Sequence, residues 1–269
     1  MRRSALHLSE AMYLPSCTKA RLPILALLVT HVLCQNFTIS NGQIFTPGFA
    51  VLDSPQPGTP MGGDTIEIAL DVTANGILPL DVAADSPSRI NNITIFLTSL
   101  ALNRNFTISN GTASSNNASL GDIMLQEPGS TVKHVRWTWP ACLVGDGKPT
   151  TSDSDRGNYN ISIRQNFVMN NTNFYTIFDV PIAVTNSIPS SISRAQCDTL
   201  DNPLLTPEQI NASAANAVGI LFAPGDSQVV QVKLDKAEGG QGLGGAGMMS
   251  WRSGAEWLCL VSIAMAFAL

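Results

Sequence analysis

The stretch DTIEIALDVT, residues 64–73, carries the clearest structural signal in this chain of 269 residues. Apolar and polar side chains alternate along it, so in an extended chain every second residue faces the same way. One face takes Ile66, Ile68, Leu70 and Val72, and the other takes Thr65, Glu67 and Asp71. This period of two predicts a β-strand that buries one face in a core and leaves the other in water.

Further segments on both sides of this stretch show a related pattern. They are residues 49–53, 93–100, 105–109, 132–139, 159–169, 174–184 and 227–235. Clusters of Pro, Gly, Asn and Ser separate them and mark turns, as in SPQPGTPMGG at residues 54–63. Many short strands with frequent turns predict an all-β fold, an antiparallel β-sandwich that is immunoglobulin-like in general architecture. We expect one domain over residues 35–237.

One short helix is expected near the C-terminal end of this domain, in TPEQINASAAN at residues 206–216. Thr206 suits the N-cap, Pro207 the first helical position and Gln209 the reciprocal position of a capping box. A glycosylation triplet begins at Asn211, so this residue of the helix is expected to face solvent.

The heptapeptide NFTISNG occurs twice, at residues 36–42 and 105–111. The residues after the two copies share no apolar register, whereas a structural repeat keeps its similarity over about 20 to 50 residues. Each copy alternates Phe and Ile with Thr and Ser and ends in Asn-Gly. This pattern predicts a strand at a sheet edge followed by a tight turn, and not a duplicated domain.

Triplets of the form N-x-[ST], the acceptors for N-glycosylation in a secretory pathway, are frequent in the chain. They begin at Asn36, Asn92, Asn105, Asn110, Asn117, Asn160, Asn170 and Asn211. An Asn- and Thr-rich composition without glycans is the alternative interpretation. The chain ends favour glycosylation, because both look like signals for processing in a secretory pathway.

At the N-terminus, basic residues precede the apolar run LPILALLVTHVL at residues 22–33. This run is shorter than the roughly 20 residues that span a bilayer, and it suits the core of a signal peptide. We expect a signal peptide over residues 1–34, with cleavage after Cys34 and with Met12 as an alternative start.

At the C-terminus, the short apolar tail WLCLVSIAMAFAL fills residues 257–269, after a Gly-rich linker and polar spacer at residues 238–256. Small residues, a spacer of about 8 to 12 residues and a terminal apolar tail form the signal for a glycosylphosphatidylinositol (GPI) anchor, which replaces the tail. Gly245 is the expected attachment residue, with Gly244 or Ser253 as alternatives. A single-pass membrane protein is the competing interpretation.

Charge and cysteine content narrow the class of protein. Residues 35–247 hold 10 Lys and Arg against 18 Asp and Glu, a net charge of −8. Such a surface repels nucleic acid, so no nucleic-acid partner is expected. Cys17, Cys34 and Cys259 fall in the processed ends, which leaves Cys142 and Cys197. An even pair in an oxidising compartment predicts one disulfide, with a stabilising effect of about 4 kcal/mol in the chain-entropy model.

Two groups of residues are candidates for binding. Trp137 and Trp139 share one face of the strand expected at residues 132–139, where paired rings either fill the core or stack on a sugar. Core packing is the favoured interpretation, and sugar contact is the alternative. The loop at residues 145–158 contains Asp146, Asp153 and Asp155, and clustered carboxylates suit calcium. Because the loop departs from the EF-hand pattern, a solvated acidic loop is favoured, and no metal or other cofactor is expected.

Catalytic groups are scarce. His134 is the one histidine outside the expected presequence, so a Ser-His-Asp triad would have to use it. The sequence has no G-x-S-x-G, C-x-x-C, H-E-x-x-H or P-loop motif. Two of the many Asp residues could form the carboxylate pair of a glycosidase. A copper site like that of polysaccharide monooxygenases would need signal cleavage after Thr30, so that His31 becomes the first residue and His134 a second ligand.

The segment NGQIFTPGFAVLDSPQPGTPMGGDTIEIALDV, residues 41–72, resembles the opening of a family of fungal secreted proteins. Members of this family are small, N-glycosylated and commonly predicted to be GPI-anchored. The resemblance extends loosely to Leu234. It implies a location at a fungal cell surface, and it brings no assigned activity and no catalytic residue.

Together these patterns predict a non-enzymatic, GPI-anchored extracellular glycoprotein of the outer plasma-membrane face or the cell wall, with a role in wall structure, adhesion or sugar contact. The expected partners are the membrane, through the lipid anchor, and a wall polysaccharide or a surface protein. The alternative is a carbohydrate-active enzyme, either a glycoside hydrolase that uses acidic residues or a copper-dependent oxidase.

Overall fold

The structure, a computed structural model, describes residues 34–109, 122–147, 154–216 and 218–233. Several predicted features lie outside these ranges. They are the signal peptide up to residue 33 with His31, the linker and tail from residue 234 with Gly244, Gly245 and Ser253, the sequons at Asn110 and Asn117, and Asp153. Within the described ranges, no helix has the length and apolar character needed to cross a membrane.

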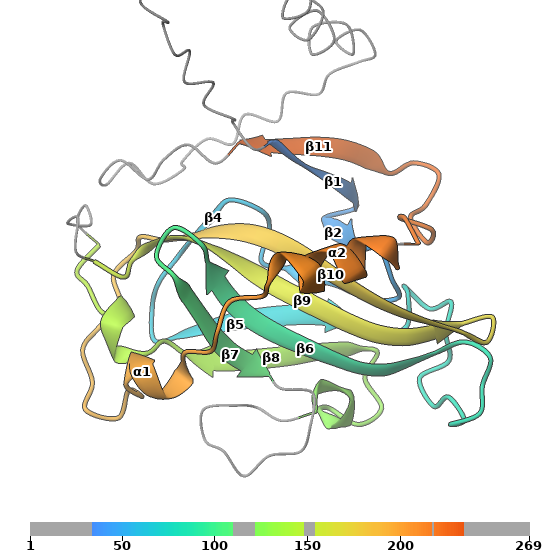
Figure 1. The fold of residues 1–269 in the computed structure, drawn as a ribbon, viewed down its shortest axis with the longest axis horizontal. Helices are drawn as coiled ribbons and strands as arrows, with labels where there is room; N and C mark the ends of the chain where they lie inside the picture. Colours follow the sequence, from blue (N-terminus) through green and yellow to red (C-terminus); the bar gives the residue numbers. More distant parts are fainter. Residues whose placement is uncertain (1–33, 110–121, 148–153, 217, 234–269) are drawn as a thin grey trace, which may run out of the picture. The chain divides into compact units, whose positions relative to one another are not determined.

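The described chain forms two β-sheets whose inner faces share one apolar core (Figure 1). Sheet A has the strand order β11-β1-β2-β3-β5-β8. Its strands are β1 (Cys34–Ser40), β2 (Gln43–Phe45), β3 (Val51–Ser54), β5 (Thr65–Asp71), β8 (Val132–Thr138) and β11 (Gln228–Lys233). Sheet B has the order β4-β10-β9-β6-β7. Its strands are β4 (Thr59–Met61), β6 (Arg89–Ser99), β7 (Arg104–Ser109), β9 (Gly157–Met169) and β10 (Thr172–Val184).

Neighbouring strands are antiparallel in both sheets, except that β4 runs parallel to β10. The predicted all-β antiparallel sandwich is therefore confirmed. Four short helical turns or helices join the strands: η1 (Ile123–Leu125), η2 (Ala141–Leu143), α1 (Cys197–Leu200) and α2 (Pro207–Ala215).

Strand β5 shows the alternation that its sequence predicts. Ile66, Ile68 and Leu70 are fully buried on the inner face, and Glu67 is exposed on the outer face. The strand lies between β3 and the edge strand β8, and its buried face contributes to the main core. Burial of this apolar row is the main reason why the segment pairs as a strand, because each fully buried Ile or Leu side chain contributes about 1.5–3 kcal/mol.

Asp71, at the end of β5, departs from the predicted pattern because it is buried. Its carboxylate accepts hydrogen bonds from the N–H groups of Thr73, at 2.8 Å, and Asn75, at 3.0 Å. The turn that it caps contains three consecutive residues of positive φ, Ala74, Asn75 and Gly76. A polar residue on the expected solvent face is thus used to hold a turn together.

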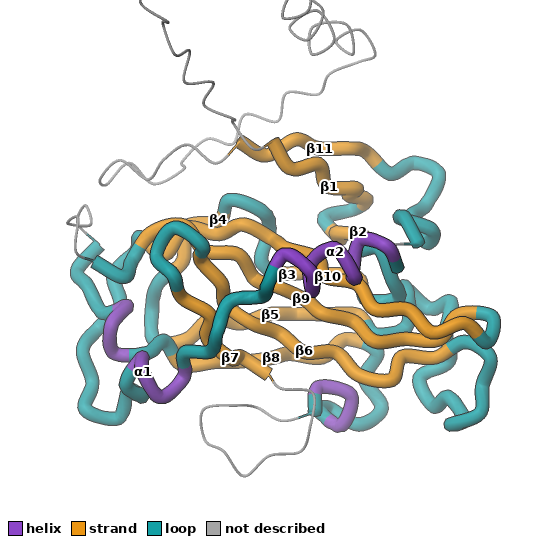
Figure 2. Tube along the Cα trace, in the orientation of Figure 1, coloured by secondary structure: helices purple, strands orange, loops and turns teal. Residues whose placement is uncertain are grey.

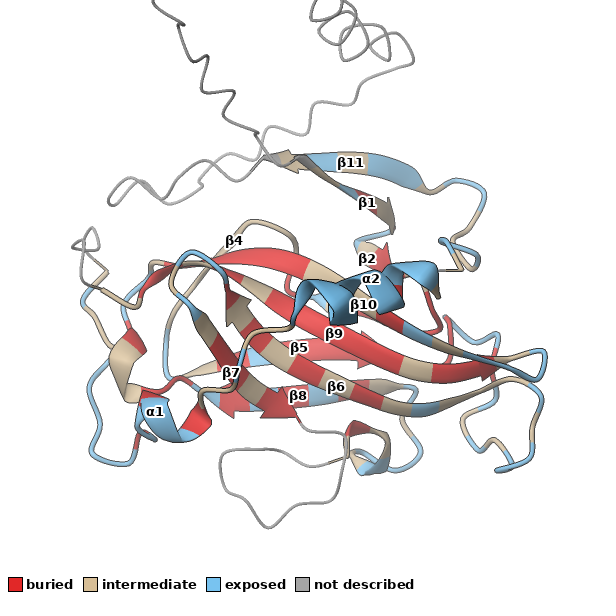
Figure 3. Cartoon of the chain, viewed as in Figure 1, coloured by how far each residue is buried: buried red, intermediate tan, exposed pale blue. Residues whose placement is uncertain are grey.

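The main core lies between the two sheets, as the alternating buried positions along β6 show (Figure 3), whereas residues 161–165 of β9 are buried on both faces. Phe37, Phe106 and Trp139 are among its largest side chains. A smaller apolar cluster is built around Phe49 and Phe167, whose ring centroids lie 5.2 Å apart.

The two copies of NFTISNG both form strands, but only one of them is an edge strand. In the first copy, Asn41 and Gly42 have φ values of 49° and 79° and turn β1 into β2, as predicted. In the second copy, β7 is an edge of sheet B. The expectation of an edge is wrong for β1, because the distant strand β11 pairs with its other side.

A segment after α1 is attached to β7 and to β10 of sheet B. Asp201 forms a bridge with Phe106 on the free edge of β7, and Ser213 of α2 accepts a hydrogen bond from the N–H of Ile177 on β10 at 2.8 Å. Because sheet A covers the inner face of sheet B, the chain between these two points crosses the outer face (Figure 2). We call residues 201–216 the strap.

Helix α2 begins as predicted. The hydroxyl of Thr206 accepts a hydrogen bond from the N–H of Gln209, and the side chain of Gln209 accepts one from the N–H of Thr206. This capping box and Pro207 at the start explain why a nine-residue helix forms here. Asn211 is exposed, as its sequon requires.

Two neighbouring substitutions in β5 test this packing. Ile68→Ala removes a fully buried side chain, so we expect the free energy of unfolding to fall by about 3 kcal/mol. Glu67→Ala removes one member of an exposed ion pair with Arg136, so we expect a change of about 0.5 kcal/mol or less. Urea unfolding of both variants measures the difference, and equal losses would contradict the assignment of faces.

Candidate functional site

Trp137 and Trp139 are both buried, with 4% and 0% of their surface exposed. Their ring centroids lie 6.0 Å apart, and Trp137 also contacts Phe106 across the core, at 6.5 Å. The indole N–H of Trp139 donates to the carbonyl of Gly62 at 3.3 Å. Neither ring presents a face to a sugar, so the prediction of sugar contact is wrong and the core-packing interpretation is the correct one.

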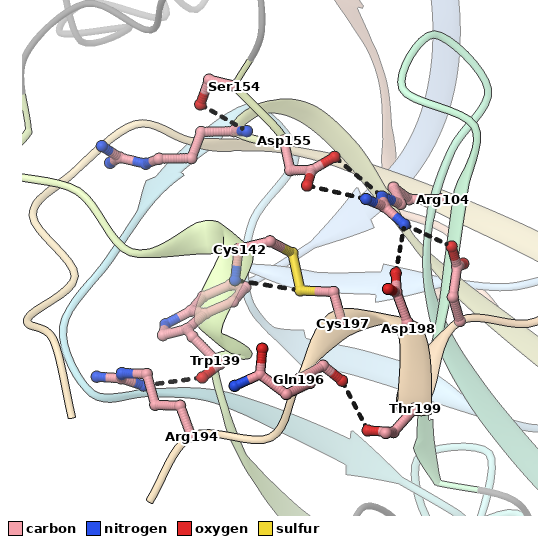
Figure 4. Close-up of a disulfide and its surroundings, with 12 residues drawn as sticks. Arg104, Trp139, Cys142, Ser154, Asp155, Arg194, Gln196, Cys197, Asp198 and Thr199 are labelled. Atoms are coloured by element: carbon pink, nitrogen blue, oxygen red, sulfur yellow. Dashed lines mark hydrogen bonds and ion pairs between the residues drawn. A yellow bond between two sulfur atoms is a disulfide. The ribbon is translucent and has the colours of Figure 1, made fainter. Parts of the chain in front are cut away.

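Cys142 and Cys197 form the predicted disulfide, which joins η2 to α1 (Figure 4). The N–H of Cys142 donates to Sγ of Cys197 at 3.2 Å. The bond links positions 55 residues apart, so it closes a long loop at one end of the sandwich.

Beside the disulfide, Arg104 forms close ion pairs with Asp155 and Asp201 and a longer one with Asp198, at 3.7 Å (Figure 4). Its Nε and Nη2 donate to the two oxygens of Asp155, at 2.9 and 3.0 Å, and its Nη1 donates to Asp201 at 2.8 Å. These hydrogen bonds raise the pKa of Arg104 above its ordinary range. The arrangement ties β7 to the segment before β9 and to the start of the strap.

The Arg104 contacts bear on two predicted sites. Asp155 is engaged in a bidentate ion pair, which does not fit a calcium ligand. Asp155 and Asp201 are two acidic residues near one another, but both are paired with the guanidinium of Arg104, whereas the carboxyls of a glycosidase pair flank the bond of a substrate. No group of three or more His, Cys, Asp or Glu able to hold a metal occurs within the described ranges.

Arg194 strengthens the same end of the sandwich. Its side chain is almost completely buried, and it donates to the carbonyls of Pro189 and Trp139, at 2.8 and 2.9 Å. A further contact joins it to the carboxylate of Asp64 at 3.1 Å. Arg194 and Arg104 therefore hold the described loops at the disulfide end together.

His134 lies on the outer face of the edge strand β8 and is exposed. Its backbone N–H donates to the carboxylate of Glu127 at 2.7 Å, and its Nδ1 lies 3.0 Å from the same carboxylate. The backbone hydrogen bond, followed by the side-chain one, lowers the pKa of Glu127. Glu127 thus covers a free N–H of the edge strand, which is a structural role.

The sequons within the described ranges differ in exposure. Three acceptor residues are exposed: Asn36, Asn170 and Asn211. Asn92 and Asn160 are half-buried on the outer face of sheet B. Glycosylation at these five positions stays a prediction.

Asn105 contradicts the prediction of a glycan at every sequon, because only 2% of its surface is exposed. Its amide Nδ2, the atom that would carry the sugar, donates to the carbonyl of Pro203 at 2.6 Å beneath the strap. An N-linked glycan is bulky and needs a route to solvent, which this position lacks. The side chain of Asn105 instead holds the strap to β7 through this hydrogen bond.

The outer face of sheet B carries a polar group that sequence patterns did not single out. We call Phe96, Ser162, Arg164 and Asp179 the outer cluster; they project from β6, β9 and β10 at neighbouring ladder positions. The guanidinium carbon of Arg164 lies 3.8 Å from the centroid of the Phe96 ring, a cation–π contact. A hydrogen bond from Ser162 reaches the carboxylate of Asp179.

Burial changes the electrostatics of the outer cluster. It lowers the pKa of Arg164 and raises the pKa of Asp179, because a charged group loses hydration when it is covered. Nε of Arg164 and Oδ1 of Asp179 are both buried without a hydrogen-bond partner among the described residues. Perturbed titratable groups and unpaired polar atoms in one place are typical of a functional site.

Known proteins assign no role to these residues. No family model, no curated protein and no solved structure matches the chain.

The raised pKa of Asp179 leads to a test of stability against pH. The folded protein binds a proton at this carboxyl more tightly than the unfolded chain, whose value is close to 3.8. Ionised Asp179 therefore destabilises the fold progressively as the pH rises from about 4 through the folded-state pKa. We expect Asp179→Asn to be more stable than the wild type at pH 7, with a difference that shrinks toward pH 4.

Urea unfolding at pH 7 and pH 4 measures this difference, with Asp81→Asn at an exposed position as the matched control. A less stable Asp179→Asn protein at pH 7 would mean that the carboxylate is fully compensated in the fold, which would contradict our description of the outer cluster.

Proposed function

We propose that the chain is a non-enzymatic, GPI-anchored glycoprotein displayed on the outer face of the plasma membrane or in the cell wall, with a role in wall structure, adhesion or sugar contact. The observation that carries this proposal is the pairing of β1 with β11. Cys34 lies opposite Lys233 in this antiparallel pair, so the two ends of the described domain leave it side by side.

This arrangement suits processing at both ends. Removal of a signal peptide after Cys34 would take away only the first residue of β1, and replacement of the tail by an anchor at Gly245 would occur at the same end of this pair of strands. The sandwich itself stays intact, and about a dozen residues after Lys233 separate it from the anchor. One point of attachment leaves the remaining surface free for contacts.

The positions of the exposed sequons support display in an extracellular setting. Asn36 lies on β1, Asn170 in the turn between β9 and β10, and Asn211 on α2. Glycans at these three places would be spread over separate elements and would not disturb the core. The disulfide between Cys142 and Cys197 fits the same oxidising compartment.

The enzyme alternative receives less support from the side chains. The carboxylates of Asp155 and Asp201 are paired with Arg104, and His134 is paired with Glu127. We therefore propose a binding or structural role, with the membrane as one partner through the lipid anchor and a wall polysaccharide or surface protein as the other. The resemblance of residues 41–72 to fungal surface proteins accords with this proposal.

Anchor release and peptide mapping test the proposal together. Phosphatidylinositol-specific phospholipase C should release the full-length product from membranes of a fungal host, with the peptide that ends at Gly245, Gly244 or Ser253 carrying the anchor remnant. Glycopeptide mapping should find sugars at Asn36, Asn170 and Asn211 and none at Asn105, because the amide of Asn105 is buried.

Asn211→Gln is the matched control, since it removes one exposed sequon and should lower the mass by one glycan without loss of release. Detection of the tail peptide, residues 257–269, on the mature membrane-bound protein would contradict the anchor. A glycan at Asn105 would contradict the described position of the strap.

A further inference from the structure

The outer face of sheet B is unusual because its charged side chains are covered. Outward positions of a sandwich strand normally meet water. Here Ser162 and Arg164 of β9 keep only 2% and 8% of their surface exposed, although they alternate with the core residues Ile161 and Ile163. The strap crosses this face (Figure 2), and Ser213 of α2 binds the N–H of Ile177, the residue opposite Arg164 in the ladder.

The cover leaves a donor and an acceptor without partners. Within the described residues, Nε of Arg164 and Oδ1 of Asp179 make no hydrogen bond, and no ion pair joins these two side chains. They project from neighbouring strands at diagonal positions of the ladder, since Arg164 lies opposite Ile177 and Asp179 lies opposite Ser162. A buried donor and acceptor of this kind destabilise a fold unless a ligand satisfies them.

The orientation of Arg164 is fixed rather than free. Its guanidinium carbon lies over the Phe96 ring, 3.8 Å from the ring centroid, so this ring helps to hold the group in place. Tyr175, on the same face of β10, is partly exposed beside the cluster. The cluster thus offers one fixed donor, one acceptor that Ser162 positions, and a neighbouring aromatic side chain.

The helix that closes the strap is weakly attached. Of the nine residues of α2, only Ser213 is buried, and the other side chains are exposed (Figure 3). Ser213 holds the helix to β10 through the N–H of Ile177. A helix of this length is marginal by itself in water, so local release of α2 should need much less free energy than unfolding of the sandwich.

We propose that the outer cluster is a binding site for a neutral polyhydroxylated ring, the chemistry of a sugar unit in a glycan, and that α2 is displaced when the ring binds. Adjacent hydroxyls can accept from Nε of Arg164 and donate to Oδ1 of Asp179. One positive and one negative side chain give the cluster no net charge, which favours a neutral ligand over an anion. This inference rests on the proposed function and names the site and ligand class for its sugar contact.

A sugar could reach this site from two sources. One is a wall polysaccharide outside the molecule. The other is the protein's own glycan at Asn160, which lies on the same face of β9, two residues before Ser162. An Asn160→Gln variant separates the two sources, because it removes the internal glycan and leaves the cluster unchanged.

The experiment uses the full chain from a secretory host, purified in detergent, and titrates it with soluble β-glucan, chitin and mannan hexasaccharides by calorimetry. Arg164→Met and Asp179→Asn should weaken binding by about tenfold or more, since each removes a charged hydrogen-bonding partner of the ligand. Ser213→Ala should strengthen binding by about twofold to tenfold, because it weakens the closed position of α2. Arg136→Met, which removes an exposed arginine of sheet A, is the matched control and should bind like the wild type.

Circular dichroism and urea unfolding check that each variant is folded, and Asp179→Asn should bind less while being more stable at pH 7. Binding that appears only after Asn160→Gln would support the site with the chain's own glycan as its occupant. Absence of saturable binding in the wild type, Ser213→Ala and Asn160→Gln alike would overturn the proposal, as would equal binding by Arg164→Met and Arg136→Met. Neither result would affect the anchored-glycoprotein proposal, which anchor release tests separately.

Discussion

The ion pairs of Arg104 with Asp155 and Asp201 determine how the outer half of this sandwich is built. They join β7 to the segment that enters β9 and to the residue where the strap begins, next to the disulfide between Cys142 and Cys197. From Asp201 the chain has to reach Ser213 on the other side of sheet B, and the core already occupies the inner face. The route across the outer face follows from this constraint.

That route changes the chemistry of the covered strands. Polar residues that would be hydrated on an open sheet become buried, with two different results. Asn105 fastens the strap, because its amide nitrogen donates to the carbonyl of Pro203, although its Oδ1 has no hydrogen-bond partner among the described residues. Arg164 and Asp179 keep unpaired atoms, and their pKa values move in the directions that disfavour charge. Buried polar atoms without partners lower the stability of a fold, and proteins usually retain them where they contribute to binding.

Much of the fold could be predicted from local patterns. The alternation of apolar and polar residues identified β5, β9 and β10, and the residues from Thr206 to Gln209 predicted the N-terminal cap of α2. Elimination among five cysteines gave the correct disulfide.

The pairing of β1 with β11 could not be predicted, because a strand's sequence says little about a partner almost 200 residues away. The outer cluster was missed for the same reason, since the strap that crosses the face of Arg164 comes about 40 residues later in the chain. Trp137 and Trp139 were correctly predicted to lie on the same face, but alternation alone does not show whether that face belongs to the core or to a binding surface.

Hydrogen exchange at the backbone N–H of Ile177 tests the central claim most directly, namely that α2 opens independently of the sandwich. This group is bonded to the Ser213 hydroxyl, whereas the N–H groups of Ile161 and Ile163 lie in β9, between two strands. We expect the N–H of Ile177 to exchange through a low-energy local opening and to lose its protection in Ser213→Ala. The same substitution should leave the exchange of Ile161 and Ile163 unchanged. Exchange of Ile177 at the slow rate of Ile161 and Ile163, insensitive to Ser213→Ala, would show that the strap is a fixed part of the core structure and would contradict the account.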